Sequence, residues 1–443
     1  MKISLSDNFS YGKLLRFTLP SIAMMIFSSI YGVVDGFFVS NFAGKTPFAA
    51  VNFIMPLLMI LGTVGFMFGT GGSALVSLTI GEGDRKRANE IFSLIVYASL
   101  IVGVAIAILG IIFIRPIAVF LGAEGQMLED SVIYGRIILL ALPAFILQME
   151  FQSFVVTAEK PQLGFFVTVA AGVANMVLDY LLVGVIPLGL VGAATATAIS
   201  QCIGGFVPLA YFASKNSSLL RIGKTRFDGR ALLKTCTNGS SELMSNISMS
   251  VVGMLYNTQL YDIAGEDGVA AYGVMMYVSM IFCGAFIGYT VGVAPVIGYH
   301  YGAANVGELK SLLKKSVVIV SSFSVCMVAL AFALASPLSK LFVGYDETLF
   351  EMTRNGFFIF SLSFLFMGFA IFGSGFFTAL NDGLTSAAIS FLRTLVFQII
   401  AVLLLPAIFG LDGIWWSIVV AEVMAVAVWL LFLILKRNKY KYF

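Results

Sequence analysis

Long apolar runs separated by short polar stretches follow one another along the whole chain. Glycine, proline, asparagine or charged residues bound each run, and a helix needs about 20 apolar residues to cross the bilayer core. The pattern therefore predicts twelve membrane-spanning helices, at residues 14–39, 50–79, 91–114, 132–157, 162–186, 190–213, 236–261, 270–299, 313–335, 353–379, 384–408 and 411–435.

The longest polar segment, residues 214–235, divides the chain into two parts that resemble each other. Identical residues recur 221 positions apart in one constant register, as in Gly71 and Gly292, Gly81 and Gly302, Thr157 and Thr378, and Gly189 and Gly410. A fixed period of this kind indicates an internal repeat. We predict an N-terminal six-helix half at 1–213, a cytoplasmic linker at 214–235 and a C-terminal six-helix half at 236–443, pseudo-symmetric around a central cavity.

Basic residues are unevenly shared between the two sides of the predicted membrane protein. One side, which includes both termini and the central linker, holds Lys2, Lys13, Arg16, Arg85, Lys86, Arg87, Lys160, Lys215, Arg221, Lys224, Arg226, Arg230, Lys234, Lys310, Lys314, Lys315, Lys436, Arg437, Lys439 and Lys441. The opposite side keeps only Lys45, Arg115, Lys340 and Arg354. Cytoplasmic loops carry an excess of lysine and arginine. We therefore expect both termini in the cytoplasm, which requires an even number of spans.

Composition excludes an ordinary soluble protein. Charged residues are 11% of the chain and hydrophobic residues 59%, with a mean hydropathy of +0.99, whereas soluble domains carry about 25% charged residues. The four cysteines are far apart and the chain has one histidine, His300, so no cysteine or histidine metal site is expected. The net charge of +3 comes without a basic face or binding motif, so nucleic acid is not an expected partner.

Polar residues inside the predicted spans are concentrated in the first half. Asp35 lies in the first span, Asn175 and Asp179 in the fifth, and Thr197 in the sixth. Asn175 and Asp179 are four residues apart and so share one helix face. Ionisable groups cost about 2.5–3.5 kcal/mol each at the centre of a membrane helix, which makes them candidates for function.

These four residues offer oxygen ligands that suit a hard cation such as sodium. Two neighbouring carboxylates in a low dielectric could instead hold a proton. A buried polar network that only packs helices is the structural alternative. The positions 221 residues further on are Tyr256, Val396 and Ile400, so the acids are not repeated and we expect ion coupling in the first half.

Other intramembrane polar residues are candidates for the substrate cavity: Gln148, Glu150, Tyr256, Asn257 and Arg393. Glu150 can equally pack between helices. Arg393 can serve as a counter-ion, a substrate contact or a residue that reaches the membrane surface. Glu242 is the nearest candidate for an acidic site in the second half. Methionine and phenylalanine side chains can line an adaptable apolar cavity.

The sequence gives little support for an enzymatic function. Residues Gly81–Asp84 spell GEGD, a motif of intramembrane aspartyl proteases, but it runs into Arg85-Lys86-Arg87 in a predicted loop. No HExxH metalloprotease motif, phosphate-binding loop or dinucleotide fingerprint occurs. We expect neither an enzyme nor an ATP-driven pump.

Several segments together resemble the multidrug and toxic compound extrusion (MATE) family. They read VDGFFVSNFAG, GTGGSALVS, IGEGD, TAEKP and NMVLDYLLVGVIPLGLVGAATATAIS, and the resemblance covers nearly the whole chain. The Asn-x-x-x-Asp segment followed by Pro-Leu-Gly-x-x-Gly-Ala-Ala is the most specific of them.

The resemblance implies a secondary antiporter that exports amphipathic, often cationic compounds in exchange for protons or sodium ions, with no further cofactor. It implies that Asp35, Asn175, Asp179 and Thr197 couple the ion and would bind it as a metal if it is sodium. Tyr134 resembles a tyrosine of the same region, and Pro20 the proline at which the first span bends. The missing second-half acids and Arg393 resemble the prokaryotic branch of DNA-damage-inducible protein F. A monomer in the plasma (inner) membrane is implied.

Two other hypotheses about transport remain as alternatives. A lipid-linked oligosaccharide flippase of the same superfamily would need a strongly cationic cavity for pyrophosphate, whereas intramembrane acids outnumber the two intramembrane arginines here, Arg136 and Arg393. An uncoupled channel would pass its substrate without any ion gradient.

Overall fold

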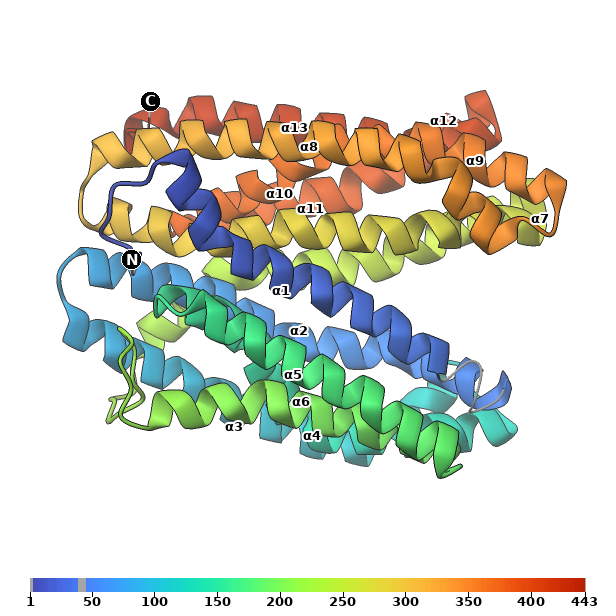
Figure 1. The fold of residues 1–443 in the computed structure, drawn as a ribbon, viewed down its shortest axis with the longest axis horizontal. Helices are drawn as coiled ribbons and strands as arrows, with labels where there is room; N and C mark the ends of the chain where they lie inside the picture. Colours follow the sequence, from blue (N-terminus) through green and yellow to red (C-terminus); the bar gives the residue numbers. More distant parts are fainter. Residues whose placement is uncertain (1–2, 39–44, 443) are drawn as a thin grey trace.

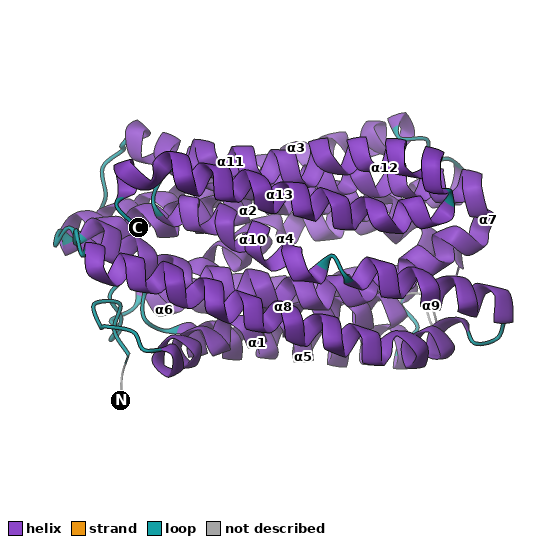
Figure 2. Ribbon diagram, turned by 90° about the horizontal axis from the view of Figure 1, so that it is seen from above, coloured by secondary structure: helices purple, strands orange, loops and turns teal. Residues whose placement is uncertain are grey.

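The computed structural model describes residues 3–38 and 45–442, which form only helices and connecting loops (Figure 2). The helices are α1 (Tyr11–Phe38), α2 (Lys45–Gly81), α3 (Arg85–Phe120), α4 (Gly125–Thr157), α5 (Pro161–Asp179), α6 (Gly189–Ala213), α7 (Gly229–Gly302), α8 (Val306–Val343), α9 (Glu347–Ser361), α10 (Phe364–Ala379), α11 (Gly383–Phe391), α12 (Phe397–Phe409) and α13 (Leu411–Tyr440). Two π-helical turns, η2 (Tyr180–Val185) and η3 (Leu392–Val396), continue α5 and α11.

The prediction of an all-helical membrane protein is confirmed. In the described part of the chain, ten helical segments are long and apolar enough to cross a membrane, and the bent pair α9 and α10, which meet at 46°, makes an eleventh. The 74-residue α7 would be about 110 Å long if straight, far more than one crossing.

A single glycine folds α7 into a hairpin. Gly265 has φ 65° and ψ −150°, which is outside the helical region and suits glycine because it lacks a Cβ. The rings of Tyr256 and Tyr272 stack face to face across the fold, 5.4 Å apart, whereas a continuous helix would separate them by about 24 Å. Counted as two spans, α7 brings the total to the predicted twelve.

The helices form two groups that lie side by side, with α2–α6 in the lower part of Figure 1 and α8–α13 in the upper part, while α1 runs obliquely from the upper left to the lower right. Both chain termini lie at the same end of the molecule (Figure 1). The long helices run roughly along one axis, which would be the membrane normal.

Helices α2 and α7 meet through backbone contacts that obey a pseudo-two-fold relation. A Cβ added to Gly81 would collide with the carbonyl of Tyr299, and one added to Gly302 would collide with the carbonyl of Leu78. Gly81 and Gly302 are repeat partners, and so are Leu78 and Tyr299. Small residues therefore let the two halves approach closely at the end that carries the termini.

The hydrophobic core is shared between the halves at one end only. The largest buried cluster combines first-half residues such as Phe92 and Phe154 with second-half residues such as Phe286 and Phe372. Towards the opposite end, each half has a separate core, around Ile138 in the first half and around Trp415 in the second. The two halves are thus joined at the end that carries the termini.

The repeat register is not constant throughout, contrary to the prediction. The offset of 221 holds at the positive-φ pairs Gly83 and Ala304, and Gly189 and Gly410. Between them, positive φ at Glu159 corresponds to Asn381, 222 positions on, and the starts of α4 and α9, Gly125 and Glu347, are also 222 positions apart. The extra residue of the second half therefore lies before α9. In this local register Asp179 corresponds to Ala401, which is also apolar, and the absence of a repeated acid still holds. The helix α7 begins at Gly229, so residues 229–235 of the predicted linker are helical.

Candidate functional site

Asp35 lies near the end of α1 and faces three polar side chains from two other helices. Its carboxylate lies beside the carboxyl group of Asp179 and the amide of Asn175, and Thr197 donates a hydrogen bond to Asp35 Oδ1 at 3.4 Å. The structure therefore brings together the four residues for which the sequence predicts ion coupling. They come from α1, α5 and α6, within the first half.

A local change of helix type positions Asp179. It is the last residue of α5, and the π-helical turn η2 starts at the next residue, Tyr180. Single π turns insert one extra residue into a helix and are frequent at functional sites. Asn175 and Asp179 are 1% and 0% exposed, so both side chains point inward as their four-residue spacing predicts.

Tyr134 of α4 borders the same site. Its side chain is 1% exposed, its hydroxyl lies beside Thr197, and the charges of Asp35 and Asp179 act on it. The fourth helix of the first half thus contributes a hydroxyl at the position that the family resemblance implied.

The charge of this site is not compensated by the protein. No described lysine or arginine forms an ion pair with Asp35 or Asp179. Both carboxyl oxygens of Asp179 and the amide oxygen of Asn175 are buried without a hydrogen-bond partner. Two adjacent carboxylates repel in a low dielectric, so a cation or a proton between them lowers the free energy of the site. The donor set can bind either one.

Gln148 extends the polar interior of the first half. Tyr31, which it faces, was not among the residues predicted from the sequence. Gln148 is 4% exposed and packs against Gly204 of α6, and its amide faces the hydroxyl of Tyr31 in α1. Tyr31 is four residues before Asp35, one helical turn away. That spacing was the signal in the sequence that could have identified it.

Glu150 lies on a different face of α4. It is fully buried beside Ser99 of α3, and its backbone packs against Gly69 of α2. Two residues along a helix amount to about 200° of rotation, so Gln148 and Glu150 point in nearly opposite directions. Gln148 is the one that faces Tyr31, on which the charge of Asp35 acts.

Arg393 has a carboxylate partner in the second half. It lies in the π-helical turn η3, and its Nε is 3.0 and 2.9 Å from the two carboxylate oxygens of Glu422 in α13. The Arg393 and Glu422 side chains are 14% and 3% exposed. Glu242 of α7 is close enough for its charge to act on Arg393. This ion pair is what the counter-ion role would require, and the three roles considered for Arg393 stay predictions.

Tyr256 and Asn257 are neighbours in sequence but lie in different surroundings. Tyr256 is 2% exposed and donates a hydrogen bond to Gln398 Oε1 at 2.7 Å. Asn257 is exposed and lines an open hollow of about 340 Å³ near the turn of α7. Of the five residues predicted for the substrate cavity, Tyr256 and Arg393 both lie near Glu422, whereas Gln148, Glu150 and Asn257 lie in other surroundings.

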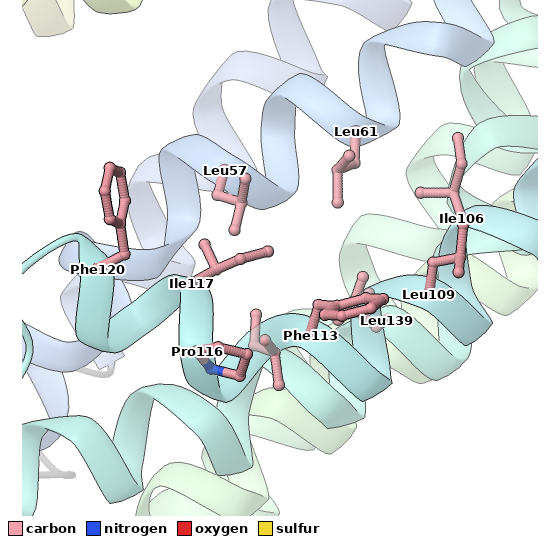
Figure 3. Close-up of a pocket in the computed structure, with 11 residues that line it drawn as sticks. Leu57, Leu61, Ile106, Leu109, Phe113, Pro116, Ile117, Phe120 and Leu139 are labelled. Atoms are coloured by element: carbon pink, nitrogen blue, oxygen red, sulfur yellow. The ribbon is translucent and has the colours of Figure 1, made fainter.

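An apolar groove of about 500 Å³ lies between α2, α3 and α4 (Figure 3). Leu57 and Leu61 of α2 face Ile106, Leu109, Phe113, Pro116, Ile117 and Phe120 of α3, with Leu139 of α4 beside them. It contains none of the predicted site residues, and much of its lining is exposed at the helix surface.

Comparison with known proteins places the chain among membrane transporters. The MatE family model matches residues 20–181 and again residues 243–404. The chain is 26% identical to the multidrug export protein MepA of Staphylococcus saprophyticus over 435 residues, which cover 96% of this chain and 94% of that protein. It is 27% identical to the protein of the same name from Staphylococcus haemolyticus over 417 residues, covering 92% of this chain and 90% of that protein.

Solved structures have the same fold. A MATE crystal structure in the straight conformation matches with a TM-score of 0.92 at 22% identity, covering 98% of each chain. An outward-facing multidrug resistance MATE family transporter of the MOP superfamily matches with a TM-score of 0.91 at 24% identity, also over 98% of each chain. A MOP superfamily transporter from Pyrococcus furiosus, described as having a binding pocket of reversed polarity, matches with a TM-score of 0.90 at 23% identity, covering 98% of this chain and 97% of that one.

Proposed function

We propose that this chain, which belongs to the MatE family of membrane transporters, exports amphipathic, often cationic compounds in exchange for protons or sodium ions. The observation that carries the proposal is the pair of adjacent carboxyl groups, the buried Asp179 and the half-buried Asp35, to which the described residues supply no counter-cation. Asn175, Thr197 and Tyr134 complete a set of oxygen donors around them. A transporter can use such a site to exchange one ion in each cycle.

The substrate class follows from the relatives and from the chemistry of the chain. Relatives that align over almost the whole length are named multidrug export proteins. The chain contains 19 methionines and 41 phenylalanines, side chains that pack against apolar compounds of varied shape. Gln148, Glu150, Tyr256, Asn257 and Arg393 remain our candidates for substrate contacts in conformations other than this one. Transport requires no further partner, and the working unit is a monomer.

The direction of transport follows from the orientation of the chain. The end that carries both termini also carries the basic loops, so we place it in the cytoplasm of a prokaryotic cell, with the protein in the plasma (inner) membrane. The ion enters from the outer side, binds at Asp35 and Asp179, and displaces the first-half helices that contact substrate. Substrate leaves outward, and the ion leaves inward as the halves reset, with Pro20 as a bending point of α1.

The finer placement of the chain follows its relatives. MepA proteins share about a quarter of its residues, and we propose a MepA-like exporter. The branch resembling DNA-damage-inducible protein F, which Arg393 and the absent second-half acids suggested, is a finer hypothesis that none of these relatives supports specifically.

The experiment that tests the proposal measures efflux of a fluorescent cationic dye from proteoliposomes under separately imposed proton and sodium gradients. Wild-type protein should move dye under one of the two gradients, and Asp179→Asn should remove that dependence. The gradient that drives the dye identifies the ion. Dye movement that ignores both gradients and Asp179 would contradict antiport and indicate the channel, while lipid-linked oligosaccharide movement without dye efflux would indicate the flippase.

A further inference from the structure

The segment before α1 is held by the second half of the molecule, although it leads into the first. The backbone N–H of Phe9 donates to Glu308 Oε1 in α8 at 2.9 Å, and Lys315 of α8 donates to the Phe9 carbonyl. At the end of α7, His300 Nε2 lies 3.2 Å from the carbonyl of Asp7. Two second-half helices therefore fix the entrance to the first half.

The same segment is also attached to the first half. Glu159, in the turn between α4 and α5, accepts a hydrogen bond from the Ser4 hydroxyl at 2.5 Å and from the Leu5 N–H at 2.8 Å. The side chains of Leu5 and Phe9 are 0% and 1% exposed and belong to the core that both halves share. Residues 3–10 thus bridge the two halves.

The repeat partner of this segment makes the reciprocal connection. It lies in the linker before α7, where Asp228 forms an ion pair with Arg87 of α3. The Thr225 hydroxyl donates to the Glu90 carbonyl of α3 at 2.7 Å, and the Gly223 N–H donates to Ser93 Oγ at 3.0 Å. In each half, the segment that enters its first helix is therefore held by the third helix of the other half.

The anchoring residues are themselves repeat partners. Arg87 in α3 and Glu308 in α8 are 221 positions apart, the offset that relates the ends of α2 and α7. Their chemistry differs, since Arg87 binds a carboxylate and Glu308 binds a backbone N–H, yet each makes a charge-assisted hydrogen bond, the stronger kind. The pKa of Asp228 lies below its ordinary value because the Ala231 N–H and Arg87 both stabilise its carboxylate.

We propose that residues 3–10 and 223–228 form a pair of clasps that hold the molecule closed at the end that carries the termini, and that both must release before the halves separate there. The halves share a core at this end and touch through Gly81 and Gly302. Separation would break the Glu308–Phe9 and Arg87–Asp228 contacts together. The inference rests on the alternating access of the proposed function.

Distances between spin labels at the start of α5 and the start of α11 test the clasps directly. The labels are placed on Gln162→Cys and Leu384→Cys, both exposed positions outside the clasps, after the four native cysteines are replaced by serine. Double electron–electron resonance in nanodiscs then compares the parent with Arg87→Ala, Glu308→Ala and the double variant. Arg87 is chosen rather than Asp228, because Asp228 also caps α7.

Each single variant should raise the ratio of separated to closed molecules about threefold, and the double variant about tenfold or more, since each loses one charge-assisted contact that only the closed state makes. Glu308→Gln keeps an acceptor oxygen for Phe9 and should give a smaller shift than Glu308→Ala. Glu124→Gln, an exposed acid at the opposite end whose side chain makes no capping hydrogen bond, is the control and should give none.

A double variant that keeps its thermal unfolding midpoint but shows the parent's distance distribution would overturn the clasps. So would an equal shift in Glu124→Gln. If the double variant does not fold, the comparison of Glu308→Gln with Glu308→Ala decides the question. The distances are read without dye or ion gradient, so failure of the clasps is distinguishable from failure of antiport, which appears as unchanged dye efflux in Asp179→Asn.

Discussion

The two halves each place a charged side chain on their fifth helix, Asp179 and Arg393, but treat the charge in opposite ways. In the first half, Asp35 and Asp179 lie side by side with no described basic residue as a partner. In the second half, Glu422 is neutralised by Arg393 at 2.9 Å. Each cluster includes a π-helical turn, η2 next to Asp179 and η3 around Arg393. A fixed counter-ion removes the need for an exchangeable one, so we assign ion coupling to the uncompensated half.

The contrast between the two halves is tested most directly by Asp179→Asn. This substitution removes one carboxylate and keeps the shape of the side chain. Ion-driven dye efflux should fall about 100-fold, the upper end of the usual coupling between two sites. Dye flux in proteoliposomes under the driving gradient measures it. Asp412→Asn, an exposed acid in the first turn of α13, is the control, and an equal loss there would remove the special role of Asp179.

A lysine in place of Thr197 should give the first-half carboxylates a fixed counter-ion, as Arg393 gives Glu422 in the second half. Thr197 lies 3.4 Å from Asp35, so an ammonium group there can pair with the carboxylate and replace the exchangeable ion. We expect ion-driven efflux to fall at least about tenfold while the protein stays folded. Thr197→Met is the matched control for side-chain size. Full gradient-driven transport by Thr197→Lys would show that the site tolerates a fixed counter-ion.

Removal of Arg393 should reduce stability rather than coupling. Arg393→Ala leaves Glu422 buried without its partner, which costs about 3–5 kcal/mol of unfolding free energy. Replacing both residues with apolar ones, as in Arg393→Met with Glu422→Leu, should recover most of that loss. Thermal unfolding in detergent compares the three proteins. If the double replacement is folded and stable but cannot transport, the ion pair has a role beyond stability and the contrast between the halves weakens.

The smallest effect is expected at Tyr256, the repeat partner of Asp35. Tyr256→Phe removes the hydrogen bond to Gln398 and leaves a buried acceptor unpaired, which costs about 1–3 kcal/mol. Efflux by the remaining folded protein should stay close to that of the parent. Asp35→Asn, measured in parallel, should lose ion-driven efflux. Similar losses at both positions would mean that the two halves share the coupling work.

The sequence was informative about the site because its residues follow local rules. The four-residue spacing of Asn175 and Asp179 predicted one helix face, and both side chains point inward. Their approach to Asp35, 140 and more positions away, depends on how α1 packs against α5, which no local pattern encodes. The opposite directions of Gln148 and Glu150 followed from helix geometry, yet which neighbour each one meets was decided by packing alone.

The apolar runs, the basic loops and the repeat by themselves determined a twelve-span protein in two related halves, because membrane insertion depends on local hydrophobicity and charge. The same sequence left the role of Arg393 open, since a charged residue in a span can pair, bind or reach the surface, and only the packing of α13 brought Glu422 to it. The extra residue of the second half before α9 and the attachment of each entering segment to the opposite half also came from the tertiary structure. Contacts between distant segments depend on the shape of the whole chain, and the one-dimensional pattern carries no distance between them.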